Sequence, residues 1–221
     1  MDSSLLFSLR LSFQVASVAT VFSVLVGTGI AYLLARKSFR GKEVLDLLFT
    51  LPLVLPPTVI GYYLILFAGR NGLIGSLLYR WTGWSIVFTW VAAVLASFVV
   101  SLPLMIKTTR AAIESVDEAL IDASYTLGHN ELMTAVKVIL PLSKKGILAG
   151  AVLSFARALG EFGATLMIAG NIPGKTDTMP LAIYTSVSSG EWSGANLLVL
   201  FFTLISGFFI YIANRFSRRT I

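Results

Sequence analysis

Long apolar runs, separated by short polar and often basic segments, dominate the hydropathy pattern of this chain. A helix that crosses a bilayer needs about 20 mostly apolar residues, and five of these runs are long enough. They cover approximately residues 11–35, 44–68, 85–106, 147–170 and 195–213. The pattern therefore predicts an all-α integral membrane protein of five spans, organised as one transmembrane domain over residues 1–221.

The composition supports this class. Hydrophobic residues make up 56% of the 221 positions and charged residues only 13%, whereas about 25% of the residues of an average soluble domain are charged. The net charge of +6 could indicate nucleic acid binding, but membrane proteins also collect Lys and Arg on one side. We therefore expect membrane lipid as a partner, and no nucleic acid. The chain has no cysteine, which excludes disulfides and thiolate metal ligands.

The basic residues are unevenly distributed among the loops. Most of the 17 follow the first or third predicted span or lie near the C-terminus. Under the positive-inside rule these segments are cytoplasmic, so the N-terminus lies outside and the C-terminus inside. The residues concerned are Arg36, Lys37, Arg40, Lys42, Lys107, Arg110, Lys137, Lys144, Lys145, Arg215, Arg218 and Arg219.

Residues 169–176, AGNIPGKT, loosely match a phosphate-binding P-loop. The context argues against nucleotide binding, because the segment follows a membrane helix on the side away from the cytoplasm. Pro173 also removes one of the N–H donors that would surround a phosphate. We expect an exposed, turn-rich loop, and a short outer helix after it in the stretch PLAIYTSVSSG.

Three prolines interrupt the second predicted span, at Pro52, Pro56 and Pro57. Each removes a helix hydrogen bond, and carbonyls freed within a bilayer need partners from neighbouring helices or from water. The pattern fits a kinked packing helix and a pore-lining hinge equally well.

The fourth predicted span contains charge and small residues. Arg157 and Glu161 are four residues apart, which predicts an ion pair on one helix face. Such a pair either stabilises the helix bundle, which we favour because the pair neutralises itself, or forms a polar feature of a translocation path. Gly146 and Gly150 form a small-xxx-small pattern, which predicts close contact with another helix.

Residues 115–141, between the third and fourth spans, are too polar to cross a membrane but have helical periodicity. Ser115 and Glu118 predict a capping box. Gly128 predicts a left-handed helix stop and Asn130 the cap of a second helix, which Pro141 is expected to end. The pattern indicates two short amphipathic helices joined by a tight turn.

Such a helix pair could lie on lipid headgroups or fit a groove on a cytoplasmic partner. The acidic first helix, with Asp117, Glu118 and Asp122, favours the partner over anionic lipid. His129 lies in the turn, where a solvated residue is a better interpretation than a metal ligand, because no companion ligands are nearby.

The stretch DASYTLGHNELMTAVKVILP, residues 122–141, resembles the EAA loop of type I ABC-importer permeases. That motif reads Glu-Ala-Ala, three residues, Gly, nine residues and Ile-x-Leu-Pro. Asp for Glu, Ser for Ala and Val for Ile are conservative departures. The matching positions are Asp122, Ala123, Ser124, Gly128, Val138, Leu140 and Pro141.

Residues 155–184, FARALGEFGATLMIAGNIPGKTDTMPLAIY, are similar to the molybdate permeases of this family, as are residues 35–46 and 51–64. Sulfate permeases look similar in the 155–184 segment, so sulfate or thiosulfate is the nearest alternative substrate.

The resemblance implies the type I importer permease fold in a bacterial inner membrane, and a pore subunit without enzymatic activity or bound cofactor. It implies a homodimer of permeases and two cytoplasmic ATPase subunits that use the ATP. A periplasmic binding protein would deliver molybdate or tungstate. The implied ATPase-coupling residues are Asp117, Glu118, Asp122, Ala123, Ser124, Gly128, Leu140 and Pro141. The pore or gate candidates are Pro56, Pro57, Arg157, Glu161 and Asn171.

Three other classes fit less well. A channel or secondary transporter that does not use ATP would usually show matching broken helices and more ionisable residues within the spans. A membrane enzyme is disfavoured because the chain has a single histidine and no G-x-S-x-G motif. A scaffold protein would suit residues 115–141 but would not explain the prolines of the second span.

Overall fold

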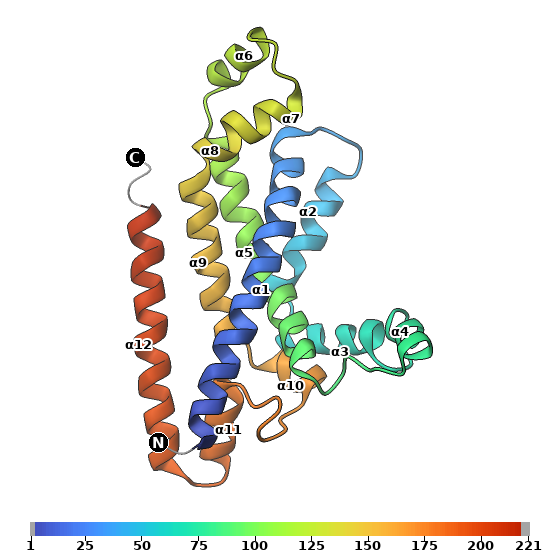
Figure 1. The fold of residues 1–221 in the computed structure, drawn as a ribbon, viewed down its shortest axis with the longest axis vertical. Coiled ribbons are helices and arrows are strands. Elements are labelled where there is room, and N and C mark those ends of the chain that lie inside the picture. Colours follow the sequence, from blue (N-terminus) through green and yellow to red (C-terminus); the bar gives the residue numbers. More distant parts are fainter. Residues whose placement is uncertain (1–2, 218–221) are drawn as a thin grey trace.

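The computed structural model describes residues 3–217, and these form helices joined by short loops (Figure 1). Helices α1, α5, α9 and α12 run along the long axis of the molecule. In chain order the elements are α1 (Ser3–Arg36), α2 (Lys42–Thr50), the 3-10 turn η1 (Leu51–Leu53), α3 (Pro57–Ala68), α4 (Gly75–Thr82), α5 (Trp90–Glu114), α6 (Glu118–Thr126), α7 (Glu131–Thr134), the π-helical segment η2 (Ala135–Ile139), α8 (Leu140–Leu142), α9 (Lys144–Leu159), α10 (Gly163–Ala169), α11 (Met179–Ser188) and α12 (Trp192–Ser217).

Within residues 3–217, three helices are each long and apolar enough to cross a membrane. These are α1, α5 and α12, which contain or largely overlap the first, third and fifth predicted spans. The number rises to five if each of two sharply bent helix pairs counts as one span. α11 forms where a short helix was predicted between the fourth and fifth spans.

The second predicted span is not a straight helix. α2 and η1 end before Pro56, and α3 continues at 115° to them. Pro57 forces this break, because a residue that precedes proline is disfavoured in the helical conformation, and Pro56 accordingly has φ −54° and ψ 136°. α3 and α4 consequently extend sideways from the upright helices (Figure 1).

The fourth predicted span is also interrupted, so the prediction of one continuous helix over 147–170 is wrong. α9 ends at Leu159, and a short non-helical link leads to α10 at Gly163. At its other end, α9 makes an angle of 69° with the helical segment Glu131–Leu142 that precedes it.

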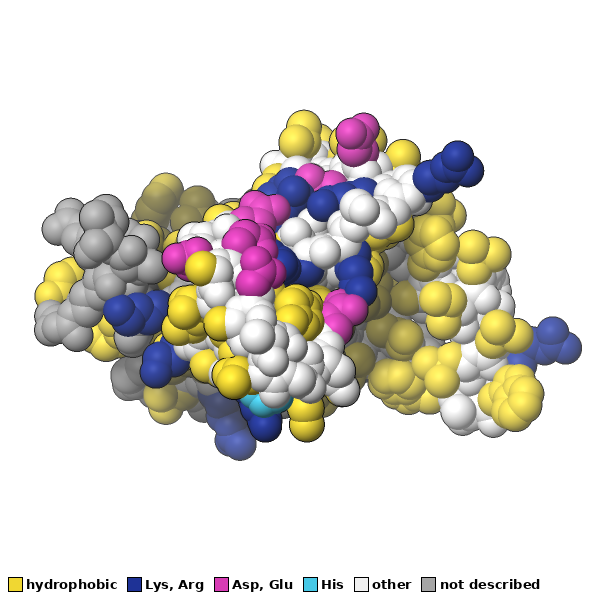
Figure 2. Space-filling view, turned by 90° about the horizontal axis from the view of Figure 1, so that it is seen from above, with side chains coloured by type: hydrophobic (Ala, Val, Ile, Leu, Met, Phe, Trp, Pro, Cys, Tyr) yellow, Lys and Arg dark blue, Asp and Glu magenta, His cyan; other side chains and the backbone are white. Residues whose placement is uncertain are grey.

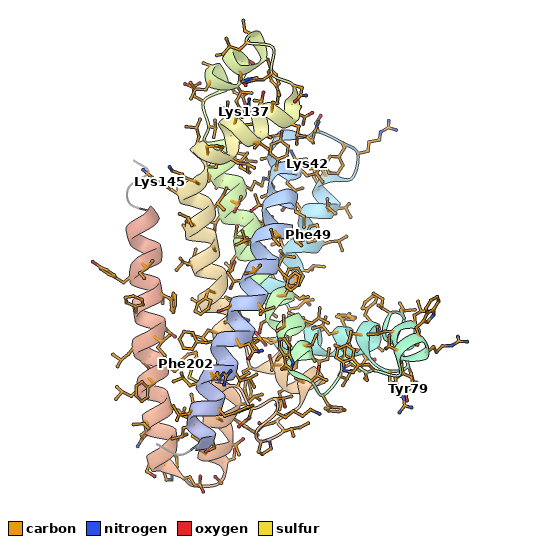
Figure 3. All side chains as sticks on the ribbon, viewed as in Figure 1. Lys42, Phe49, Tyr79, Lys137, Lys145 and Phe202 are labelled. Carbon is orange, nitrogen blue, oxygen red and sulfur yellow. The ribbon has the colours of Figure 1, made fainter. Side chains whose placement is uncertain are left out.

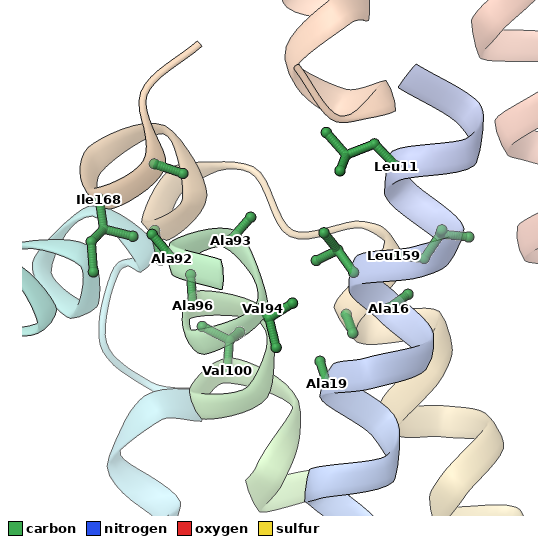
Figure 4. Close-up of a cluster of buried hydrophobic side chains, with 14 of the residues drawn as sticks. Leu11, Ala16, Ala19, Ala92, Ala93, Val94, Ala96, Val100, Leu159 and Ile168 are labelled. Carbon is green, nitrogen blue, oxygen red and sulfur yellow. The ribbon is translucent and has the colours of Figure 1, made fainter. Parts of the chain in front are cut away.

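Small side chains allow α1, α5 and α9 to pack closely. The predicted contact at Gly146 is confirmed, because a Cβ added there would lie 2.2 Å from Ala112 Cβ on α5. A Cβ added at Gly150 would lie 3.0 Å from Met105 Sδ. Close backbone approach is the main source of helix association in lipid, where apolar burial provides little driving force. Figure 4 shows how many alanines the buried cluster contains, among them Ala16, Ala19, Ala92, Ala93 and Ala96.

The basic segments gather at one end of the molecule. The ends of α1 and α5, the starts of α2 and α9 and the whole of α6–α8 lie there, and α1 begins at the opposite end (Figure 1). Lys42, Lys137 and Lys145 mark this basic end in Figure 3.

Candidate functional site

Two short helical segments project from the basic end, and we call residues 115–142 the knuckle (Figure 1). Gly128 has φ +83°, as predicted for a left-handed stop. Asn130 Oδ1 accepts a hydrogen bond from the Met133 N–H at 2.9 Å, which confirms the predicted cap of the second segment. The turn is thus fixed by local residues.

The predicted Ser115–Glu118 capping box is wrong. Asp117 is the N-cap of α6, and its Oδ1 accepts from the Ala119 N–H at 2.9 Å. The hydroxyl of Ser115 instead donates to the Ala112 carbonyl, because α5 extends as far as Glu114. The start of α6 is therefore set by where α5 ends.

Hydroxyl groups connect the two segments of the knuckle. Ser124 Oγ lies 2.9 Å from Thr134 Oγ1 and 3.1 Å from His129 Nδ1. His129 is half-buried and helps to hold the turn, so it is less solvated than expected. Within residues 3–217, no group of three or more His, Cys, Asp or Glu residues could hold a metal ion.

Pro141 does not end the second segment, contrary to the sequence prediction. The helix continues to Leu142, and the π-helical segment η2 precedes the proline. A π-helical turn changes the local hydrogen-bond register, so the missing proline N–H is accommodated without a break. The chain turns sharply only afterwards, into α9.

The knuckle presents an apolar groove of about 330 Å³ between α6 and α8. Ala123, Ser124 and Pro141, three of the coupling candidates, line it together with Leu120 and Leu127. Leu127 is 79% exposed. Hydrophobic side chains, acidic residues and the histidine share this end of the molecule in Figure 2.

The other coupling candidates lie apart from this groove. Leu140 lines a different apolar groove, which the knuckle forms with α1 and α9. Gly128 provides the left-handed backbone conformation of the turn, and Asp117 caps the start of α6. Asp122 is exposed, and its carboxylate has no partner among the residues that the structure describes.

Ion pairs join the knuckle to the end of α1, which the sequence did not reveal. Arg36 Nη1 and Nη2 lie 2.5 Å and 3.1 Å from the two carboxylate oxygens of Glu118. Lys37 Nζ lies 2.5 Å from Glu131 Oε2. The hydrogen bond from Arg36 lowers the pKa of Glu118. Glu118 is thus already paired within the chain, which leaves Asp122 as the free acidic group on α6.

A second ionic cluster holds α2 against α5. Asp46 accepts from Lys107 Nζ at 2.7 Å and from Arg110 Nη1 at 3.0 Å. Arg110 Nε also contacts Glu114 at 2.7 Å. Part of the charge at the basic end is therefore balanced by carboxylates of the chain itself.

The pore candidates lie near the two helix breaks, with one exception. Arg157 Nη2 lies 2.9 Å from Glu161 Oε2, so the predicted pair forms, although Glu161 follows the end of α9 instead of sharing its face. Pro57 lies beside the second break, since a Cβ added at Gly163 would be 2.9 Å from Pro57 Cβ. The break at residues 54–56 and the break after Leu159 thus come close together.

Asn171 lies elsewhere, in the loop between α10 and α11, where its amide donates to Thr185 Oγ1 at 2.6 Å. This is the P-loop-like segment, and several of its N–H groups are already used, two of them by side chains. Ile172 N donates to Thr176 Oγ1 at 2.9 Å and Gly174 N to Asp177 Oδ1 at 3.0 Å. The loop has turns but is only partly exposed, because Thr176 is buried.

Comparison with known proteins identifies the family. Residues 23–221 match the model of the binding-protein-dependent transport system inner membrane component. The chain belongs to this family. A molybdenum transport system permease protein of Escherichia coli K12 is 47% identical over 192 residues, with 86% of this chain and 84% of that protein covered.

Other comparisons give the same class. The corresponding molybdenum permease of Haemophilus influenzae is 43% identical, with 96% of this chain and 93% of that protein covered. A sulfate transport system permease protein of Salmonella typhimurium is 32% identical over 96% of this chain and 78% of its own length. The fold matches an inward-facing structure of the MetNI methionine ABC transporter with a TM-score of 0.76 and 15% identity, over 100% of both chains. The protein is a multi-pass membrane protein with the type I ABC importer permease fold.

Proposed function

We propose that this chain is the membrane-spanning subunit of an ATP-driven importer of molybdate or tungstate. The observation that carries the proposal is 47% identity to the molybdenum permease of Escherichia coli over most of both chains. The sulfate permease is less similar, at 32% identity. Sulfate or thiosulfate is therefore the second candidate substrate, because all four of these tetrahedral dianions have the same charge and related shapes.

We further propose that the chain itself hydrolyses no ATP and binds no cofactor. Two copies form the pore in the bacterial inner membrane, and a periplasmic binding protein delivers the anion. The basic end faces the cytoplasm, since Lys and Arg collect on that side, and the N-terminus faces outward. Selectivity among the dianions then lies mainly in the binding protein.

The knuckle is the proposed docking site of a cytoplasmic ATPase subunit. Its short amphipathic helices and exposed apolar side chains fit the helix-in-groove mode of recognition, with Leu127 and the carboxylate of Asp122 available to a groove on the partner. Gly128 and the Ser124–Thr134 contact hold the two segments as one body. Because its two segments are held together, the knuckle passes a movement of the ATPase subunit to the membrane helices without changing shape.

Three connections carry such a displacement into the membrane. The knuckle continues directly into α5 at one end and α9 at the other, and Glu118 and Glu131 attach it to α1. When ATP closes the two ATPase subunits, these helices rock together and the pore opens outward. Hydrolysis reverses the motion. ATP can drive this change only by stabilising one of the two arrangements more than the other.

Reconstitution with the cognate ATPase and binding protein tests the proposal. Molybdate and tungstate should stimulate ATP turnover and uptake into proteoliposomes, and sulfate should do so much less. A sulfate response that exceeds the molybdate response would favour the sulfate permease. Uptake that continues without the ATPase subunit would instead identify a channel or secondary transporter, a class to which the two broken spans would also be suited.

A further inference from the structure

The last turn of α9 holds an arginine, Arg157, whose hydrogen-bonding capacity is mostly unused. Arg157 Nη2 contacts Glu161 Oε2 at 2.9 Å, and the Arg157 side chain is 32% exposed. Within residues 3–217, Glu161 is the only partner of this guanidinium. A guanidinium has five N–H donors, so most of those of Arg157 remain available at the exposed side.

Glu161 also accepts a hydrogen bond from the backbone, through the carboxylate oxygen that does not contact Arg157. Its side chain is 1% exposed, and Oε1 accepts a hydrogen bond from the Ala164 N–H at 2.8 Å. The carboxylate thus also satisfies the backbone at the start of α10. An acidic side chain buried between two donors is well held, and it fixes the orientation of the longer Arg157 side chain.

In the proposed orientation, Arg157 also lies at a depth in the membrane where unpaired hydrogen-bond donors are unusual. α9 begins at Lys144, at the basic end, and a rise of 1.5 Å per residue places Arg157 about 20 Å further along the helix. With the basic end at the cytoplasmic surface, as proposed, this position falls within a hydrocarbon core about 30 Å thick. Ionisable groups at such depth are costly unless they face other protein groups or a water-filled path.

Arg157 also lies near the place where two helix interruptions come together. Two interrupted helices meet here, because Gly163 of α10 packs against Pro57 at the start of α3. Non-helical backbone at membrane depth is tolerated where protein buries it or where it lines an aqueous cavity. The partly exposed guanidinium, in the last turn of α9, is held by Glu161 of the link that leads to this junction.

We propose that Arg157 binds the oxyanion during its passage through the membrane, and that Glu161 is a positioning residue for it. The substrate identity rests on the proposed function, but the anion preference of the site does not. The planar fork of a guanidinium matches two oxygens of a tetrahedral oxyanion, and it keeps its charge at every physiological pH. Because Glu161 competes for the same guanidinium, the oxyanion is bound weakly enough to be released.

The absence of native cysteine permits a direct test in the complete importer reconstituted in proteoliposomes. Leu153→Cys and Gly160→Cys place reporter thiols on either side of Arg157. A Cβ at Gly160 fits without a clash, since its nearest neighbour would be Phe202 Cζ at 3.5 Å. The rate of labelling is compared for anionic and cationic methanethiosulfonate reagents of similar size.

The anionic reagent should be favoured about tenfold more with Arg157 present than in an Arg157→Gln background, because unlike charges attract strongly at short range in a medium of low dielectric. Molybdate should slow the labelling only when Arg157 is present. Arg10→Gln, which removes the same charge from an exposed position on α1, should leave the preference unchanged.

Measurements of uptake distinguish anion binding by Arg157 from a purely structural role of the Arg157–Glu161 pair. Arg157→Gln should lose at least tenfold in uptake. It also leaves the buried Glu161 without its cation, so less of the protein should fold. Arg157→Gln/Glu161→Gln should restore the amount of folded protein without restoring uptake or anion preference. Uptake restored by this neutral pair would overturn the proposal, as would failure of both thiols to react with either reagent. If the anion preference is present but molybdate is not transported, the proposed substrate is wrong and the anion site stands.

Discussion

At the scale of single residues, Asp177 shows how the fold removes an acidic group from water. Its side chain lies between the α10–α11 loop and α1, where Oδ2 accepts from Ser8 Oγ at 3.1 Å and Oδ1 from the Gly174 N–H. On the same face of α1, Ser12 Oγ accepts from the Met179 N–H at 2.7 Å. The loop is therefore attached to the start of α1 by polar contacts.

Burial raises the pKa of Asp177 above its ordinary value of 3.8, and the hydrogen bonds from Ser8 and Gly174 lower it only in part. An acid whose pKa is higher in the folded than in the unfolded state stabilises the fold fully below the unfolded pKa. That stabilisation is lost as the pH rises through the folded pKa. The free energy of unfolding should therefore decrease as the pH rises through this interval, on account of Asp177.

Asp177→Asn should remove this part of the pH dependence, since Asn keeps an acceptor for Gly174 and does not ionise. Thermal unfolding of the purified permease in detergent, measured from pH 4 upward to neutrality, provides the check. The variant should be at least as stable as the wild type at neutral pH. A pH slope in Asp177→Asn equal to that of the wild type would contradict the prediction.

At the scale of elements, the connection between α1 and the knuckle is the feature with the clearest consequence. The sequence placed Glu118 among residues that a partner would contact, but the structure pairs it with Arg36. The pair lies between elements far apart in sequence and has no local signal. Its proposed effect is to make α1 follow the knuckle when the ATPase subunits close.

Charge exchange should reveal this connection. Glu118→Arg should reduce uptake several-fold through repulsion of Arg36, and Arg36→Glu/Glu118→Arg should restore much of it. Uptake and ATP turnover by the reconstituted importer are measured together. Asp122→Arg makes the same change on α6 at a residue whose carboxylate has no partner in residues 3–217, and Arg36→Glu should not rescue it. Equal rescue of both variants would show that Arg36 acts through general charge alone.

At the scale of the whole molecule, the proposed orientation in the membrane follows from the gathering of basic residues at one end (Figure 1). Leu127, 79% exposed on the knuckle, should then face the cytoplasm, and Lys175, exposed in the α10–α11 loop, should face the periplasm. Because the chain has no cysteine, each position can carry a single reporter thiol.

A membrane-impermeant maleimide should label Lys175→Cys in intact spheroplasts and Leu127→Cys only in inside-out vesicles. The physical reason is the retention of Lys- and Arg-rich segments on the cytoplasmic side during insertion. Labelling of Leu127→Cys from outside would place the knuckle in the periplasm. In that orientation no ATPase could dock on it, and the proposed coupling mechanism would fail.

Features that depend on neighbouring residues along the chain could be predicted from the sequence. The apolar runs located the membrane helices, and Gly128 and Asn130 defined the turn of the knuckle. The Gly146 spacing predicted a close helix contact. In each case the physical cause acts within about one helical turn or through the bilayer, which selects for apolar length whatever the fold.

Tertiary structure alone decided where breaks and charges meet. Prolines indicated a disturbance in the second span, but the 115° turn and its packing against α10 could not be read from them. The pairing of Arg36 with Glu118, and the burial of Asp177 against Ser8, join residues from distant parts of the chain. Such contacts depend on how helices are placed in space, and the periodicity of one helix carries no information about which charge of another will face it.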